Sequence, residues 1–244
     1  MKIQRFFFFI LILLGIGACK DDEKGNLTVH FKALYDGQPL SMFNTKPFTN
    51  PEQLQFTHLS FLVSDLALVD QTNIVDLDDI ELVDLSFDDV NDADLGYIIQ
   101  FKDIDARNYS GIKFGIGVPA DVNAKTPAEF PSNHPLSKTG YYWEAWSSYI
   151  FTKIEGHIDT LGVGDFTTGF AYHTGTDDLF LPLEAPVPIT VEDGKNKVIE
   201  IVIDFKEVLD GINIKANPQN HNPADSVQIA QIVENLSHAI TLIQ

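Results

Sequence analysis

Residues 111–118 read GIKFGIGV, and this short stretch indicates the fold class of the chain. Its large apolar side chains fall on every second residue, at Ile112, Phe114, Ile116 and Val118, and a lysine and glycines stand between them. A β-strand places alternate side chains on opposite faces of a sheet. The alternation therefore predicts a strand with one face in the core.

The same alternation recurs before and after this stretch. In three further segments the apolar side chains share one strand face: Leu27, Val29 and Phe31; Tyr97, Ile99 and Phe101; Ile199, Ile201 and Ile203. Asp-Gly pairs at 36–37, 193–194 and 210–211 are typical of tight turns. We therefore expect an all-β fold, an antiparallel two-sheet sandwich with a C-terminal helix, in one domain spanning residues 27–244.

Two segments depart from the strand pattern. Residues 119–140 are rich in Pro, Asn, Ser and Thr and predict a long ordered loop, a feature that is often functional in a compact domain. The tail predicts an amphipathic helix packed on the sheet edge, because Asn222-Pro223 suits a helix start. The apolar residues of this helix recur at helical spacing: Ile229, Ile232, Val233, Leu236 and Ile240.

The first residues have the order of a lipoprotein signal peptide. Two basic residues precede an apolar run over 6–14, and Ile16-Gly17-Ala18-Cys19 resembles a lipobox. The apolar run is too short for a comfortable membrane span. We expect residues 1–18 to be removed and Cys19, the single cysteine, to carry a lipid that anchors the chain to a membrane.

Residues 19–26 are then a lipidated acidic linker. Residues 20–24 read KDDEK, which resembles the export tag of Bacteroidetes-type lipoproteins, although an ordinary solvated linker has a similar composition. The expected location is the outer membrane, with the domain exposed at the cell surface.

Charge and cysteine content exclude several classes of function. The formal net charge is −19, and removal of the leader with Lys2 and Arg5 makes it two units more negative. Nucleic acids and anionic lipids are bound by clustered cations, so we expect neither as a partner. With Cys19 lipidated, no thiol remains for zinc fingers, iron–sulfur clusters or thiol redox chemistry.

Familiar enzyme motifs are missing from the sequence. It contains no nucleophile elbow, P-loop, HExxH or dinucleotide fingerprint. With 35 acidic residues, any nominated carboxylate pair is uninformative. We therefore expect a protein that is not an enzyme. A glycan-handling enzyme is an alternative supported only by analogy of fold.

The densest segment for chemistry is 111–176, which holds both tryptophans of the chain. Its consecutive motifs read GIGVPADVN at 115–123, NHPL at 133–136, YYWEAWSSYIFTKIEG at 141–156 and FAYHTG at 170–175. In this order the motifs resemble the MbnP-like family of exported copper-binding proteins. The resemblance extends over about residues 26–243.

The resemblance implies a function as a metal-binding lipoprotein. MbnP-like proteins are paired with MauG-like di-haem enzymes, and in their studied branch a tryptophan is oxidised to kynurenine beside imidazole ligands of copper. The motifs place Trp143 on that tryptophan and His173 on the family histidine. His134 is a substitute third ligand, as is His157. We expect the rings of Trp143 and His173 to meet around a common pocket.

The chain departs from the copper-binding branch at two positions. Histidines of that branch correspond here to Ser64 and Ala124, and its two cysteine pairs are missing. These departures favour a second interpretation, a metal-free module that binds an outer-membrane transporter or an extracellular ligand through residues 119–140. Trp143 is then a core anchor and His173 a hydrogen-bonded strand residue. His30, His58, His221 and His238 are expected to lie outside any site.

Overall fold

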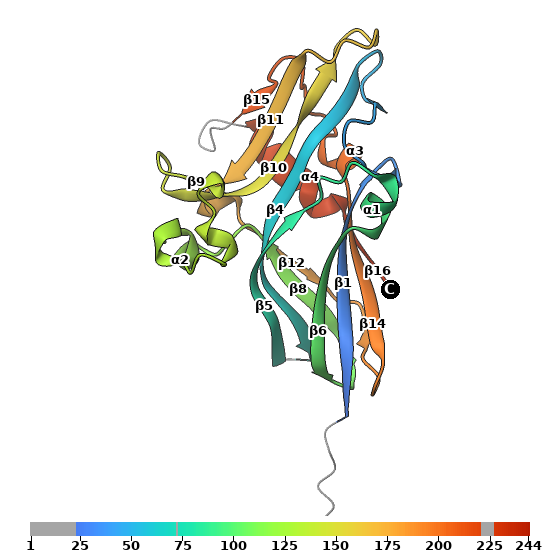
Figure 1. Cartoon of the computed structure of the whole chain (residues 1–244), viewed down its shortest axis with the longest axis vertical. Helices are drawn as coiled ribbons and strands as arrows, with labels where there is room; N and C mark the ends of the chain where they lie inside the picture. Colours follow the sequence, from blue (N-terminus) through green and yellow to red (C-terminus); the bar gives the residue numbers. More distant parts are fainter. Residues whose placement is uncertain (1–22, 72, 221–226) are drawn as a thin grey trace, which may run out of the picture.

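The computed structural model describes residues 23–71, 73–220 and 227–244. The signal peptide, Cys19 and most of the acidic linker lie outside these residues, as do His221 and the predicted helix start at Asn222-Pro223. Within the described residues, no helix has both the length and the apolar character needed to cross a membrane. In Figure 1, β1 begins at the lower end of the molecule and the β10–β11 hairpin forms the upper end.

The larger of the sheets has nine strands within the described residues. Its main path runs β12-β8-β4-β10-β11-β15, with β3 and β5 also on β4 and β9 on β10. The strands are β3 Lys46–Pro47, β4 Gln53–Asp70, β5 Asn73–Asp84, β8 Gly111–Ile116, β9 Tyr142–Trp143, β10 Ser148–Asp159, β11 Thr168–Gly175, β12 Leu181–Ala185 and β15 Gln219–Asn220.

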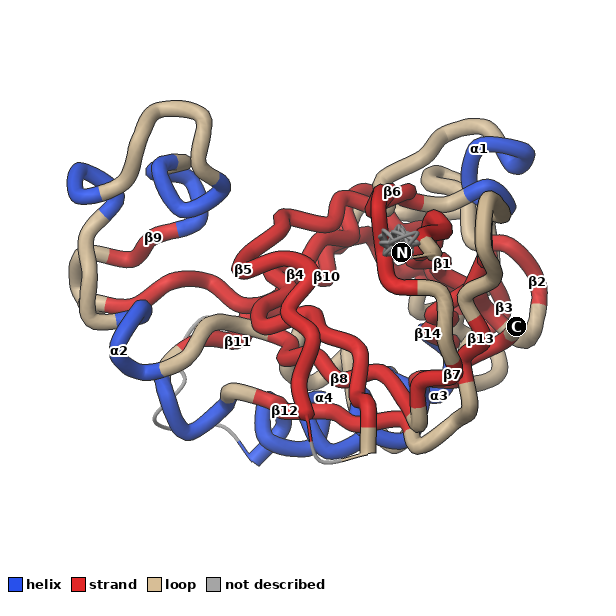
Figure 2. Tube along the Cα trace, turned by 90° about the horizontal axis from the view of Figure 1, so that it is seen from below, coloured by secondary structure: helices blue, strands red, loops and turns tan. Residues whose placement is uncertain are grey.

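The second sheet has five strands in the order β16-β14-β1-β2, with β6 on β1. Its strands are β1 Lys24–Tyr35, β2 Gln38–Pro39, β6 Tyr97–Asp105, β14 Asn196–Asp204 and β16 Ile240–Ile243. A small third sheet pairs β7 Asn108–Tyr109 with β13 Ile189–Thr190. Figure 2 shows the curled sheet of β5, β4, β8 and β12 facing β6, β1 and β14.

The mainly β prediction is confirmed, but the expectation of a purely antiparallel two-sheet sandwich is wrong. β1 pairs with β14 in parallel, and so do β11 and β15. The larger sheet curls into a half-barrel where β4 changes partners, near a register shift between Leu66 and Ala67. Such a bulge sharpens the local twist of a strand. An Asp-Gly turn predicts pairing only between the two strands that it connects. It gives no information about pairing between strands that are far apart in the sequence.

The predicted alternation is confirmed in the core. Leu27, Val29 and Phe31 are fully buried, as are the isoleucines of β14. Edge-to-face aromatic contacts cross between the sheets, with Phe31 of β1 at 5.9 Å from Phe61 and 6.0 Å from Phe114, measured between ring centroids. Such pairs add to the free energy that burial alone provides. One apolar core therefore joins the two main sheets.

Short helices decorate the strands. The α-helices are α1 Val90–Leu95, α2 Ala120–Asn123, α3 Phe205–Val208 and α4 Val227–Ala239, and the 3-10 turns are η1 Pro127–Glu129, η2 Pro135–Ser137, η3 Thr139–Tyr141 and η4 Asp177–Leu179.

The C-terminal helix is confirmed as α4, with its apolar face buried through Ile229, Ile232 and Leu236. Its position differs from the predicted sheet edge, because α4 contacts β11 and β12 of one sheet and β14 and β16 of the other. Ile240 was predicted in the helix but begins β16, where it pairs with Ile203. Helical spacing cannot distinguish the last helical residue from an apolar strand residue that follows it.

Residues 119–147 form a small lobe beside the larger sheet. Figures 1 and 2 show this lobe, with α2 and β9, projecting to one side of the larger sheet. It is ordered by a second apolar cluster in which Leu136, Tyr149 and Phe151 are buried. The predicted loop at 119–140 is thus a compact series of short helical turns.

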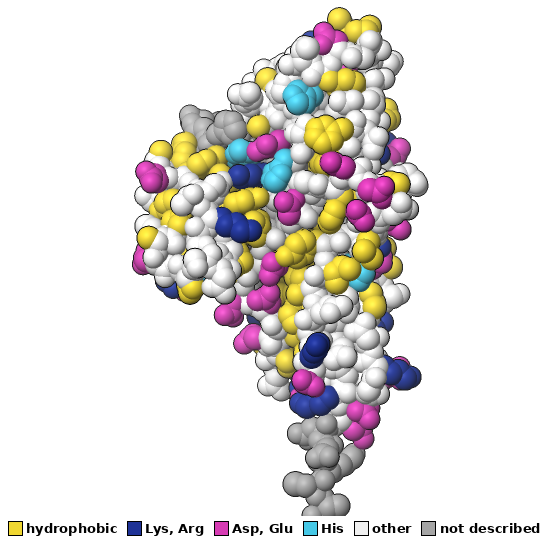
Figure 3. Space-filling model, in the orientation of Figure 1, with side chains coloured by type: hydrophobic (Ala, Val, Ile, Leu, Met, Phe, Trp, Pro, Cys, Tyr) yellow, Lys and Arg dark blue, Asp and Glu magenta, His cyan; other side chains and the backbone are white. Residues whose placement is uncertain are grey.

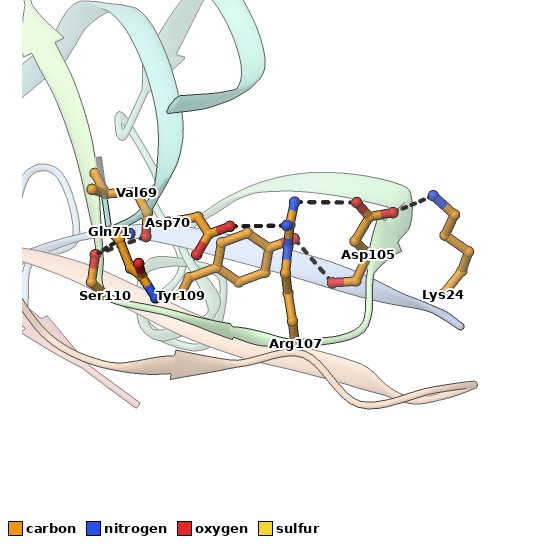
Figure 4. A network of polar contacts seen from close by, with 8 residues as sticks. All are labelled: Lys24, Val69, Asp70, Gln71, Asp105, Arg107, Tyr109 and Ser110. Atoms are coloured by element: carbon orange, nitrogen blue, oxygen red, sulfur yellow. Dashed lines mark hydrogen bonds and ion pairs between the residues drawn. The ribbon is translucent and has the colours of Figure 1, made fainter. Parts of the chain in front are cut away.

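A polar network fastens the two sheets together near the start of β1 (Figure 4). Arg107 bridges Asp70, at the end of β4, at 2.9 Å and Asp105, at the end of β6, at 3.2 Å. Lys24 forms a further ion pair with Asp105, and its hydrogen bond lowers the pKa of that carboxyl group. The Tyr109 hydroxyl donates to the Asp105 carbonyl at 2.9 Å.

Candidate functional site

The candidate site lies on the outer face of the larger sheet, where β4, β10 and β11 run side by side. The register places Lys153 of β10 between Ser60 of β4 and His173 of β11, and Glu155 opposite His58. Directly paired residues share a face, and so do residues two apart on a strand. Figure 3 shows histidine side chains on this face among acidic and hydrophobic ones, next to the lobe.

His173 is held by a carboxylate on the neighbouring strand. Its Nε2 atom lies 2.7 Å from Oε1 of Glu155, and the His173 side chain is only 12% exposed. An ionised carboxylate only accepts hydrogen bonds, so the Nε2–H group donates to it. This bond fixes the orientation of the ring, as carboxylates do for histidines that bind metals.

Trp143 packs against the same imidazole. It ends β9, which pairs with the start of β10 through Trp143 and Ser148. The ring centroids of Trp143 and His173 are 5.8 Å apart, with their planes at 38°. The structure therefore brings together the two rings that the sequence places 30 residues apart.

The lobe that carries Trp143 is fastened to the sheet face by Lys153. Its Nζ atom donates to the carbonyl of Gly140 at 2.7 Å and lies 4.1 Å from the centroid of the Tyr141 ring. The Tyr141 hydroxyl contacts Oγ of Ser60 at 2.8 Å. Burial lowers the pKa of Lys153 and raises that of Tyr141. A half-buried ammonium group thus bonds a carbonyl and a π-face, which compensates for its lost hydration.

His134 occupies a different environment, inside the lobe. Its Nδ1 atom accepts a hydrogen bond from the backbone N–H of Leu136 at 3.1 Å, and so caps the turn η2. Its ring stacks on Phe130 at 4.6 Å between centroids. These contacts explain why the residue is ordered, and they do not join it to Trp143 or His173.

The remaining histidines have other partners. Both ring nitrogens of His58 are bonded by hydroxyls, Nδ1 to Ser86 at 3.0 Å and Nε2 to Ser60 at 2.8 Å. His30 bonds the carbonyl of Leu95 at 2.9 Å. His238 contacts Glu234 on the surface of α4, and His221 lies outside the described residues.

The donor set at His173 suits copper only in part. Imidazole nitrogen is a good ligand for copper, and the Glu155 carboxylate is hydrogen-bonded to Nε2 of the same ring. However, the part of the chain that the structure describes has no cluster of three or more His, Cys, Asp or Glu side chains that could hold a metal ion. A complete copper site here needs a further donor besides this pair.

Comparison with known proteins assigns the family. The family model described as MbnP matches residues 24–225, most of the chain. The chain belongs to the MbnP family. Among solved structures, MbnP from Methylosinus trichosporium is similar with a TM-score of 0.61 at 13% identity, covering 90% of this chain and 98% of that one. At this identity the likeness shows the fold. No curated protein sequence matches the chain significantly.

Two properties are associated with the MbnP family as a whole. The family is generally considered non-catalytic and copper-binding, and it is associated with MauG-like di-haem enzymes. These associations agree with the resemblance drawn from the motifs in residues 111–176. They do not assign ligands in this chain.

One residue of the site cannot be identified from the sequence of this MbnP family chain. Glu155 lies inside the motif at 141–156, yet with 35 acidic residues nothing singled it out. The signal that identifies it is strand register, because Glu155 is diagonal to His173 across β10 and β11. Diagonal neighbours on one face are within reach of long side chains.

Proposed function

We propose that this chain is an exported copper-binding protein whose site is built around His173, Glu155 and Trp143. The observation that supports the proposal is the contact of the Trp143 and His173 rings, 5.8 Å apart between centroids, on a face that also carries Glu155. These two rings come from the motifs at 141–156 and 170–175, which are part of the resemblance to the family.

Each residue has a defined role in the proposal. His173 supplies an imidazole nitrogen, and Glu155 orients that ring or contributes an oxygen. Trp143 supplies the remaining donor after oxidation to kynurenine, whose amine and ketone are ligand atoms that indole lacks. His134 is a substitute ligand in this proposal only through its Nε2 atom and after the lobe brings its ring to the site, because its Nδ1 atom caps η2. Copper bound here is held by nitrogen and oxygen donors without thiolate.

Copper titration of purified lipid-free protein tests the proposal, with and without coexpression of a MauG-like di-haem enzyme. We expect His173→Ala to weaken binding at least about tenfold, since even residues that only support a metal site have effects of this size. His238→Ala is the matched control, because His238 lies on the surface of α4, where it contacts Glu234. Unchanged copper stoichiometry and affinity in His173→Ala would remove the assignment.

We further propose that the protein is anchored in the outer membrane by a lipid on Cys19, exposed at the surface, in the lipoprotein branch of the family. The support is the lipobox-like sequence at 16–19 and the acidic residues after it. The proposed partner is a MauG-like di-haem enzyme. Cys19→Ser should move the protein from the membrane fraction to the soluble fraction; a variant that stays in the membrane would contradict the anchor.

A metal-free interaction module is the second candidate. The observation that favours it is the small donor set, since the described residues contain no three-membered cluster of metal-binding side chains. In this case the lobe at 119–147 contacts a neighbouring outer-membrane transporter. The titration above separates the two, because a module of this kind binds no copper tightly even after coexpression.

A further inference from the structure

Three aromatic rings form a continuous path from the surface to the candidate site. Trp146 is exposed, with 37% of its surface accessible to solvent. Its ring centroid lies 6.3 Å from that of Trp143, with the planes at 48°, and Trp143 in turn lies 5.8 Å from His173. Trp143 is half-buried and the His173 side chain is 12% exposed, so both inner rings are less accessible to solvent than Trp146.

The local backbone explains why the two indoles meet. The loop between β9 and β10 is closed by hydrogen bonds from the N–H of Trp146 to the carbonyl of Trp143 at 3.1 Å and from Ser147 to Glu144 at 3.2 Å. Ser147 takes a left-handed conformation, with φ of 49°, which turns the chain into β10. The turn brings the backbones of Trp143 and Trp146 together, and their rings are in contact. The contact therefore follows from a hydrogen-bonded turn.

We propose that Trp146 is the surface port through which one-electron oxidants reach Trp143. The inference rests on the proposed function, because it names the route by which the proposed oxidation of Trp143 begins. The oxidant that suits this route is a large molecule that contacts the exposed Trp146 at the surface, since Trp143 is only partly exposed. A high-valent haem protein is an oxidant of this class.

The first two steps are electron transfers that change no covalent bond. The oxidant takes one electron from the Trp146 indole, which becomes a cation radical. An electron then passes from Trp143 to Trp146, which restores Trp146 and leaves the cation radical on Trp143. A second oxidant molecule takes another electron by the same route, and addition of one water then converts Trp143 to hydroxytryptophan with release of two protons, which adds one oxygen atom to the residue.

Electrostatics favour the radical on the inner indole. The Trp143 ring contacts an imidazole that is hydrogen-bonded to the Glu155 carboxylate, so a negative charge lies one ring beyond Trp143 at the inner end of the path. Partial exclusion of water weakens screening there, so the carboxylate stabilises a cation more than it would at the exposed Trp146. The positive charge therefore moves inward.

A tethered photo-oxidant tests the route on the purified protein without copper. Ruthenium tris-bipyridine bound to dextran is oxidised to Ru(III) by a light flash with a sacrificial electron acceptor, and peptide mass spectrometry measures the oxygen added to Trp143. Trp146→Phe removes an oxidisable ring and keeps an aromatic one, whereas Trp146→Tyr keeps a ring that can be oxidised. Both substitutions are at an exposed position, and thermal unfolding verifies that each variant is folded.

We expect oxygen addition at Trp143 to fall several-fold in Trp146→Phe and to recover in Trp146→Tyr. In Trp143→Phe, oxidation should accumulate at Trp146. Equal oxidation of Trp143 in the natural chain and in Trp146→Phe would overturn the proposal, and so would oxidation confined to Trp146 in the natural chain. Because no copper is present, the result is independent of the copper titration that tests the proposed function.

Discussion

The imidazole of His173 is oriented by a single carboxylate, so Glu155 controls how the candidate site presents its nitrogen. The Nε2–H group donates to Oε1 of Glu155 at 2.7 Å, and the imidazole is largely shielded from water. Removal of the carboxylate would leave the shielded Nε2–H group of the ring without this acceptor, which costs free energy. The orientation of the ring therefore depends on that carboxylate.

Glu155→Ala should lower copper affinity about 10- to 100-fold, the range typical of residues that support metal ligands. Glu155→Gln should keep most of the affinity, since its amide oxygen still accepts from Nε2–H. Glu184→Ala, an exposed residue on β12, is the control for the change in net charge. Equal copper affinity in Glu155→Ala and the natural chain would show that the carboxylate has no part in the site.

Single residues also show what could be predicted from the sequence at the site. The motifs identify Trp143 and His173 as a pair, and the structure brings their rings into contact. Glu155 could not be singled out, because its role depends on the register between β10 and β11. Nor could the separate position of His134, which depends on its cap on η2.

At the scale of elements, the β10–β11 hairpin is closed by one buried carboxylate. Asp159 accepts hydrogen bonds from the backbone N–H groups of Leu161 and Gly162 through Oδ1, and of Gly164 and Asp165 through Oδ2. Burial alone would raise the pKa of Asp159, but these four bonds outweigh it and hold the pKa below its ordinary value.

Asp159→Asn should therefore destabilise the protein at neutral pH, because an amide nitrogen cannot accept the bonds that one carboxylate oxygen does. A depressed folded-state pKa gives stability above the unfolded pKa of about 3.9, and this stability is lost as pH falls through the folded-state value. Denaturation midpoints measured from pH 7 downward should show the gap between the two proteins closing in acid. A gap that is constant with pH would contradict this account.

The lobe is a second element whose stability can be tested by itself. Lys153→Met removes the bond to the Gly140 carbonyl and the contact with the Tyr141 ring. We expect hydrogen exchange in residues 119–147 to accelerate several-fold while global unfolding changes little, since local and global opening are separate events. Lys138→Met, exposed in the same lobe, is the control. Unchanged exchange in Lys153→Met would mean that the second apolar cluster alone holds the lobe.

Elements were predicted best where the pattern is local. The alternation around 27–31, 111–118 and 199–203 became β1, β8 and β14, because a half-buried strand has a period of two wherever it pairs. Ile240 shows the limit, since its spacing continues the helix although its backbone pairs with Ile203 in β16. Pairing partners, and not periodicity, decide the end of α4.

At the scale of the whole molecule, one aromatic core joins the sheets. Phe56 of β4 is fully buried and meets three rings, Tyr35 and Phe170 at 5.9 Å and Phe205 at 6.2 Å between centroids. These partners come from both main sheets and from α3. The parallel pairing of β1 with β14 is part of the same closure and could not be predicted, because it joins segments about 170 residues apart.

Phe56→Ala should cost about 3–5 kcal/mol in the free energy of unfolding, the usual range for a large aromatic removed from a packed core. Leu161→Ala, at a side chain that is 66% exposed, should change it by less than about 0.5 kcal/mol. Chemical denaturation measures both. A loss below about 1 kcal/mol for Phe56→Ala would contradict a single core, since surface-like substitutions have effects of that size.

The spatial claim on which the function depends is that Trp143 and the copper ligand His173 lie side by side. Trp146→Phe leaves Trp143 as the sole indole of the chain, so the tryptophan fluorescence of this variant comes from Trp143 alone. In protein that has not been oxidised, copper held by His173 should quench the fluorescence of the neighbouring indole, and adding His173→Ala should abolish the quenching. Saturable binding of copper that leaves the Trp143 emission unchanged would place the metal elsewhere and contradict the account.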